Sequence, residues 1–136
     1  MDESARWILA PGQLTSREPI DFSRWAKHSS VYISSVTVSE LLTGVHMAKT
    51  QAIKMRRSAF VEYIITKIAA IAFDDTIARI HAELHAHLIK KGKMIDAHDL
   101  IIAATAIHSG FPVLTNNVRE FERVPGLKLI DAEPVI

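Results

Sequence analysis

The sequence has no cysteine among its 136 residues. This absence excludes disulfides, thiolate zinc sites, iron–sulfur clusters and cysteine nucleophiles, and it fits a reducing compartment. The sequence also has no apolar run as long as the about 18 residues that a membrane-spanning helix requires. Asp2 and Glu3 stand where a secretory signal would carry basic residues, so we expect a cytoplasmic protein without a membrane partner.

The sequence also has little net charge, because 16 Lys and Arg residues face 15 Asp and Glu residues, for a sum of +1. This balance excludes a protein that coats nucleic acid through bulk charge, although a local basic patch remains compatible with it. No glycine-rich phosphate loop, nucleotide fingerprint or Ser-His-Asp order is present, which argues against kinases, dehydrogenases and serine hydrolases. The length and the 49% hydrophobic content predict one globular domain over residues 1–136.

Strand-like and helix-like segments alternate along the chain. Apolar and β-branched segments predict strands over residues 31–35, 68–73 (expected to be buried), 111–115 and 127–130. Helical spacing and capping signals predict helices from residue 37 onward, over 51–66, from 74 to about 90, over 96–109, and a short helical turn over 119–123. Residues 1–20 lack clear periodicity and are expected to form a loop or a short helix. The alternation predicts an α/β fold with a mainly parallel sheet flanked by helices.

Carboxylate and amide side chains stand where ligands bind in such a fold. Glu40 follows the strand at 31–35, Asp96 and Asp99 open a later helix, and Asn116 and Asn117 follow the strand at 111–115. In open α/β sheets, ligands bind outside the carboxyl ends of the strands. Oxygen ligands of this kind suit Mg²⁺ or Mn²⁺, and such an ion can promote hydrolysis of a phosphodiester. The pattern therefore predicts a hard-cation site at this edge.

Each of these residues also has a purely structural explanation. Thr37 and Glu40 match a capping box, with Thr37 as the N-cap. Asp96 suits an N-cap, and an acid such as Asp99 is favoured in the first turn of any helix. The asparagine pair at 116–117 is typical of turns. The functional interpretation is favoured because all these side chains are expected at the same edge of the sheet.

Three segments resemble motifs of the PIN-domain ribonucleases. Residues 33–44 (ISSVTVSELLTG) are similar to the second acidic motif, and residues 95–106 (IDAHDLIIAATA) to the third. Residues 114–121 (LTNNVREF) with 124–127 (VPGL) resemble the last motif. Their order and spacing are similar to those of the VapC toxins of bacterial toxin–antitoxin pairs, over roughly residues 20–131.

The resemblance implies a PIN-like three-layer fold and an endoribonuclease that depends on Mg²⁺ or Mn²⁺, cutting RNA by attack of water. It also implies a cognate antitoxin as a protein partner and a homodimer. Glu40 and Asp99 match the family's metal-site acids, Asn117 matches its fourth position, and Asp96 is an additional acid beside the site. The alternative is a PIN-like domain with an incomplete metal site that only binds RNA or a partner.

The N-terminus departs from the family pattern, in which a short apolar strand ends in a metal-binding aspartate. In the preferred alignment Asp2 takes that position as a catalytic and metal-binding acid, and the first strand is truncated because only Met1 precedes it. In the alternative alignment Ile8 and Leu9 end the strand, Ala10 takes the position of the acid, and the ligand is missing.

Further residues are candidates for contacts with RNA or with a partner. Arg119, Asn116 and Thr37 are expected to bind the substrate. The densest basic stretch is formed by Lys49, Lys54, Arg56 and Arg57, and apolar positions near Val45, Met47, Phe60 and Ile64 could line a groove for a partner helix or belong to the core.

Three histidines have a weaker functional interpretation. His81 and His85 share a helix face at i, i+4, but Glu83 does not complete an H-E-x-x-H motif. We therefore expect an ordinary solvated or dimer-facing helix there. His98, between two acids, could reach a phosphate, but simple exposure is the favoured interpretation.

Overall fold

The computed structural model describes residues 6–11 and 30–131. The strands are β1 (Arg6–Leu9), β2 (Ser30–Ser34), β3 (Ala69–Ile71), β4 (Val113–Thr115) and β5 (Leu129–Asp131). The helices are α2 (Ser35–His46), α3 (Gln51–Lys67), α4 (Asp75–Lys91), α5 (Ala97–Ser109) and α6 (Val118–Phe121). None of the helices in these two ranges combines the length and the apolar character that crossing a bilayer demands.

The strands form one sheet in the order β3-β2-β1-β4-β5, and every neighbouring pair is parallel. The predicted α/β class is therefore confirmed. β1 lies at the centre, with Ile8 opposite Tyr32 of β2 and opposite Val113 of β4. The expectation of a loop or short helix over residues 1–20 was wrong for Arg6–Leu9. A four-residue strand that is covered on both faces shows no alternation, so its sequence gives no strand signal.

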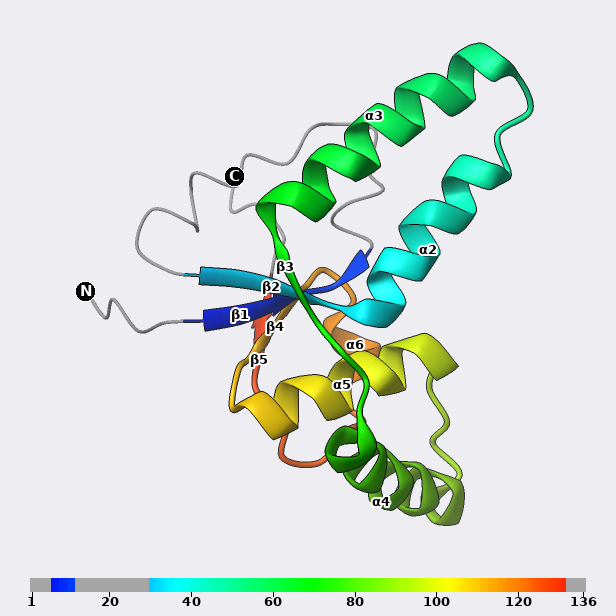
Figure 1. Cartoon of the computed structure of the whole chain (residues 1–136). Coiled ribbons are helices and arrows are strands. Elements are labelled where there is room, and N and C mark those ends of the chain that lie inside the picture. The colour runs from blue at the N-terminus through cyan, green and yellow to red at the C-terminus, as the bar shows by residue number, and fades with distance from the viewer. Residues whose placement is uncertain (1–5, 12–29, 132–136) are drawn as a thin grey trace.

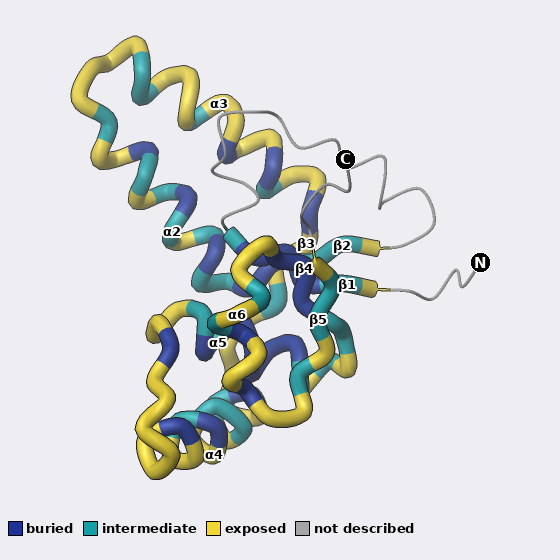
Figure 2. Tube along the Cα trace, turned by 180° about the vertical axis from the view of Figure 1, so that it is seen from behind, coloured by how far each residue is buried: buried dark blue, intermediate teal, exposed yellow. Residues whose placement is uncertain are grey.

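Helices cover both faces of the sheet, which gives three layers (Figure 1). Successive side chains of a strand point to opposite faces. Ile8 accordingly packs with the residues of α4 and α5, and Leu9 packs with those of α2 and α3. The inner faces of the helices and the central strands are buried, whereas the outer side of the α2–α3 hairpin is largely exposed (Figure 2).

The strand predicted over 68–73 is shorter and more exposed than expected. β3 spans only Ala69–Ile71, and both alanines are exposed. Among the described strands, β3 is at the edge of the sheet and has a neighbouring strand on one side only. Its apolar run alone could not distinguish an edge position from a central one.

Most helix ends lie where the capping signals predicted them. The Asp74 carboxylate accepts a hydrogen bond from the Ile77 amide at 3.0 Å, and the Asp96 side chain caps α5. Gly92 and Gly110 end α4 and α5 in the left-handed conformation, with φ of 65° and 75°. Such φ values favour glycine.

We predict that Ile8→Ala lowers the free energy of unfolding by about 2–5 kcal/mol, because Ile8 is fully buried in the central strand. Chemical denaturation followed by circular dichroism measures the change. Ile89→Ala is the matched control, since Ile89 is 56% exposed on α4. Equal losses for the two variants would show that β1 does not belong to the core.

Candidate functional site

A pocket of about 530 Å³ opens at the carboxyl edge of the sheet. It is bordered by the ends of β1 and β4 and by the start of α5. Its lining residues are Ala10, Pro11, Asp99, Thr115, Asn116, Asn117 and Phe121. Because the strands are parallel, their carboxyl ends meet at this edge. The topology therefore brings together segments that are far apart in the sequence, such as Ala10 and Asn117.

Asp99 enters the pocket from the first turn of α5, and Asp96 holds that turn in place. The Asp96 Oδ1 atom accepts hydrogen bonds from the amides of His98 at 3.0 Å and of Asp99 at 3.2 Å. The predicted N-cap role of Asp96 is therefore confirmed. Its predicted role as a metal-binding acid stays a prediction.

Glu120 is a site residue that the motif analysis did not single out. Its Oε1 atom accepts a hydrogen bond from the Asp96 amide at 3.1 Å, and its Oε2 atom accepts one from Asn117 Nδ2 at 3.0 Å. These two donors fix the carboxylate beside Asp99. The available signal was its spacing, since Asn117 and Glu120 are three residues apart at the start of a helix.

Asp99 and Glu120 form an acid pair that is joined by a hydrogen bond. Burial, the hydrogen bond with Glu120 and the charges of Glu120, Asp96 and Glu40 together raise the pKa of Asp99 to about 8, and burial is the largest of these causes. The hydrogen bond from Asp99 lowers the pKa of the Glu120 carboxyl below its ordinary value. At neutral pH, Asp99 therefore holds the proton and donates it to Glu120.

Glu40 lies next to this acid pair on α2, and it is not part of a capping box. The helix begins at Ser35 with Ser34 as the N-cap, so the prediction of Thr37 as the N-cap was wrong. The N-cap lies three residues before Thr37, and this shift removes the structural explanation for Glu40. Burial raises the pKa of Glu40, and His98 opposes this shift with its Nδ1 atom 3.2 Å from Glu40 Oε1.

The predicted substrate-binding residues differ in position. Asn116 lines the pocket and is exposed, and Arg119 is exposed on α6. Thr37 is fully buried, and its hydroxyl has no hydrogen-bond partner among the described residues. The structure therefore brings Asn116 and Arg119 to the surface beside the site but does not expose Thr37.

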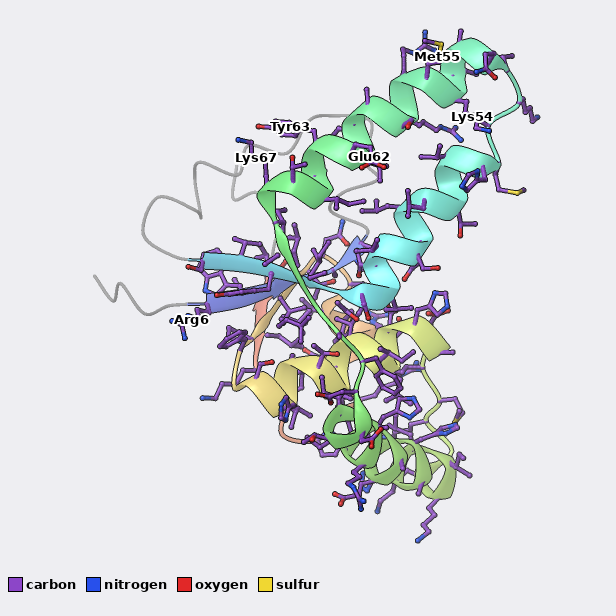
Figure 3. All side chains as sticks on the ribbon, in the orientation of Figure 1. Arg6, Lys54, Met55, Glu62, Tyr63 and Lys67 are labelled. Atoms are coloured by element: carbon purple, nitrogen blue, oxygen red, sulfur yellow. The ribbon has the colours of Figure 1, made fainter. Side chains whose placement is uncertain are left out.

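The structure describes the key residue of only one of the two N-terminal alignments. Asp2 lies outside the described residues. Ala10 follows the last residue of β1 and lines the pocket. Arg6, at the amino end of β1, is at the opposite edge of the sheet (Figure 3).

The basic stretch lies away from the pocket. Lys54 and Met55 are at the tip of the α2–α3 hairpin (Figure 3). The Arg57 Nη1 atom donates a hydrogen bond to the Gly44 carbonyl at 2.8 Å and so ties the two helices together. Arg57 therefore has a structural contact on this hairpin.

The candidate groove positions divide between core and surface. Val45 and Ile64 are buried core residues, whereas Met47 and Phe60 are exposed. The first pair therefore belongs to the core. The second pair remains available to a partner.

The histidine pair on α4 is not part of the pocket lining. The rings of His81 and His85 are 5.7 Å apart, and Phe73 packs edge-on against His81. Burial and the charge of His85 lower the pKa of His81. This environment fits the expected ordinary helix face.

The sequence matches the family model of the PIN domain over residues 8–127. This match includes every residue that lines the pocket. The chain belongs to the PIN-domain family.

Similar proteins that are named as nucleases agree with this assignment. A protein named ribonuclease VapC from Rickettsia bellii is 32% identical over 114 residues, which cover 84% of this chain and 85% of that protein. A protein named tRNA(fMet)-specific endonuclease VapC from Salmonella typhimurium is 38% identical over 104 residues, 76% of each chain. The resemblance to VapC ribonucleases is confirmed.

Solved PIN-domain structures have the same fold. The DNA-bound VapBC complex from Salmonella typhimurium matches with a TM-score of 0.83 at 28% identity, covering 94% of this chain and 98% of the other. The promoter-bound VapBC2 complex from Rickettsia felis matches with a TM-score of 0.82 at 27% identity, covering 93% and 98%. The predicted PIN-like three-layer fold is therefore confirmed.

VapC nucleases of the PIN family generally depend on a divalent metal ion, and the donor atoms of this pocket are of a suitable type. Asp99, Glu120 and Glu40 supply carboxylate oxygens, which hard cations prefer. The Glu40 Oε1 atom is buried and accepts no well-directed hydrogen bond from the described residues. Within 6–11 and 30–131, however, no three His, Asp or Glu side chains are gathered closely enough to hold an ion. The oxygen atoms of the pocket are of the type that a divalent metal ion prefers, but few of them lie close together among the described residues.

We predict that Asp99→Asn stabilises the metal-free protein increasingly as the pH rises. The pKa of Asp99 is raised to about 8 from an ordinary value of 3.8, so ionisation costs stability progressively between these values. The advantage of the variant is full above pH 8 and absent below pH 4. Because Asp99 is only about half buried, solvent screens part of this effect. We therefore expect the variant to gain on the order of 1–2 kcal/mol in the free energy of unfolding.

Denaturant titrations in EDTA at several pH values measure this difference. Asp75→Asn is the matched control, because Asp75 is an exposed acid in the first turn of α4. Parallel stability curves for Asp99→Asn and the unchanged protein would contradict the proton on Asp99.

Proposed function

We propose that this protein is the endoribonuclease toxin of a toxin–antitoxin pair, which hydrolyses RNA phosphodiester bonds with Mg²⁺ or Mn²⁺. The carrying observation is the acid pair Asp99–Glu120, with Glu40 beside it, at the carboxyl edge of a PIN-domain sheet. A cost in electrostatic free energy arises where several carboxylates are held together. A bound divalent cation would offset that cost.

The residues of the chain have separable tasks in this mechanism. Asp99, Glu120 and Glu40 would hold the ion, and Asp96 is a fourth candidate. Asn117 and the Asp96 amide orient the Glu120 carboxylate through its two oxygens. The proton on Asp99 leaves before its carboxylate can act as a ligand. When bound, the ion polarises the scissile phosphate and favours ionisation of an attacking water.

The exposed polar rim of the pocket suits an RNA backbone. Asn116 is exposed in the lining, and Arg119 is exposed between the lining residues Asn117 and Phe121. A guanidinium and an amide can donate hydrogen bonds to phosphate oxygens without reading the base sequence. A structured RNA is the expected substrate class, and tRNA(fMet) is a rational first probe because a 38% identical relative bears that name.

A cognate antitoxin and a second copy of the chain are the proposed protein partners. The α2–α3 hairpin exposes Met47, Met55, Phe60 and Tyr63, and such apolar patches are typical of protein interfaces. VapBC complexes have the same fold as this chain. We further propose that the chain acts as a single domain over residues 1–136 in the cytoplasm.

A second function is a PIN domain that only binds RNA or a partner. The observation that favours it is the lack of a group of three potential ligands within the described residues. Calorimetric titration with Mn²⁺ distinguishes the two functions. No heat at millimolar ion, together with intact RNA, would favour the binding module.

We predict that Asp99→Asn abolishes both Mn²⁺ binding and RNA cleavage, because it removes a central carboxylate from the acid pair. Calorimetry measures the first effect and gel analysis of a tRNA(fMet) transcript measures the second. Asp75→Asn should retain both properties. Cleavage at an unchanged rate by Asp99→Asn would refute the proposed role of this pocket.

We predict that Arg119→Ala weakens RNA binding in EDTA and reduces the slope of log affinity against log salt by about 1, as loss of one phosphate contact requires. Filter binding at four salt concentrations measures the slope. Arg79→Ala is the control, because Arg79 is exposed on α4. An unchanged slope would exclude a phosphate contact by Arg119.

A further inference from the structure

We propose that the ion pocket of this protein is one carboxylate short, at Ala10, and that this gap limits its affinity for the divalent ion. The inference rests on the proposed function, namely that the pocket holds such an ion. It goes beyond that function because it assigns a specific defect to one residue. It also predicts that a single substitution strengthens the site.

The backbone at Ala10 is fixed by the sheet. The Ala10 amide donates a hydrogen bond to the Leu114 carbonyl at 3.1 Å, so the pairing with β4 continues past the end of β1. Ala10 has the same orientation as Ile8, two residues earlier, and both pack in the cluster that contains α5. The Ala10 methyl group therefore points to the side of the sheet from which Asp99 enters the pocket.

This methyl group lies at the border between the apolar core and the polar pocket. Ala10 is only 4% exposed and shares the pocket lining with Asp99, Asn116 and Asn117. The pocket volume of about 530 Å³ leaves room for a longer side chain. A small apolar side chain at this place fills none of that space and offers no ligand.

The neighbouring strands make the gap more evident. β2 leads into the helix that carries Glu40, and β4 leads into the turn and helix that carry Asn117 and Glu120. β1 lies between these two strands, yet it contributes an alanine at its carboxyl end. Glu120, which Asn117 and the Asp96 amide hold in place, is the acid that interacts directly with Asp99.

The absent carboxylate has a direct electrostatic consequence. A carboxylate facing a divalent cation contributes attraction that grows as the surroundings are less polar. Among the described residues, the ion then depends on Glu40, Asp99 and Glu120, with Asp96 as a fourth candidate. We therefore expect Mn²⁺ to bind weakly and RNA cleavage to be limited by ion concentration.

The test compares Ala10→Asp with Ala10→Asn, which has nearly the same size without the charge. Calorimetry with Mn²⁺ should give an affinity at least about tenfold higher for Ala10→Asp than for the unchanged protein. Ala10→Asn should remain within about threefold. In EDTA, Ala10→Asp should melt at a lower temperature than Ala10→Asn because of repulsion from Asp99, and Mn²⁺ should raise its melting temperature more.

Asp2→Asn completes the test, because it asks whether Asp2 supplies the carboxylate that Ala10 lacks. We expect it to bind Mn²⁺ like the unchanged protein, and a tenfold loss would overturn the proposal. Equal affinities for Ala10→Asp and Ala10→Asn would also overturn it, as would failure of Ala10→Asp to fold even with Mn²⁺. If neither the unchanged protein nor Ala10→Asp binds Mn²⁺, the proposed metal-dependent function fails as well. Tight binding by the unchanged protein that Ala10→Asp does not improve overturns the inference alone.

Discussion

Parallel pairing of β1 with both β2 and β4 is the constraint on which the rest of the structure depends. A parallel sheet directs all its strands to one edge, so the segments that follow them must meet there. Residues from the start of the chain, from α5 and from the turn after β4 thereby line a single pocket. The same pairing buries Ile8 and Leu9 on opposite faces and anchors both helical layers.

This convergence gathers like charges, and local hydrogen bonds make that arrangement tolerable. Asp99 retains a proton and donates it to Glu120, whose two oxygens are also held by Asn117 and by the Asp96 amide. Glu40 lies beside His98. Stability and function therefore compete in this pocket, because the charges that would attract a divalent ion also repel one another when no ion is bound.

Local signals predicted the elements whose ends have their own chemistry. Asp74, Asp96, Gly92 and Gly110 mark helix ends because a short side chain or a left-handed backbone is needed there. The start of α2 was misassigned because Ser34 and Thr37 are both good N-cap residues, and only the strand before the helix decides between them. The edge position of β3 depends on which strands pair, which no local signal records.

The sequence by itself determined the α/β class, the family, and three of the acids and amides at the site, Glu40, Asp99 and Asn117, because motif spacing and strand–helix alternation are local properties. Only the tertiary structure revealed Glu120 as the partner of Asp99, and only it placed Ala10, which the sequence offered as an alternative, at the end of the central strand. These two assignments depend on contacts between distant segments and on which strand lies in the middle. The absence of cysteine excluded thiol chemistry, and the absence of long apolar runs argued against a membrane-spanning helix. The pairing of β1 decided where the carboxylates meet.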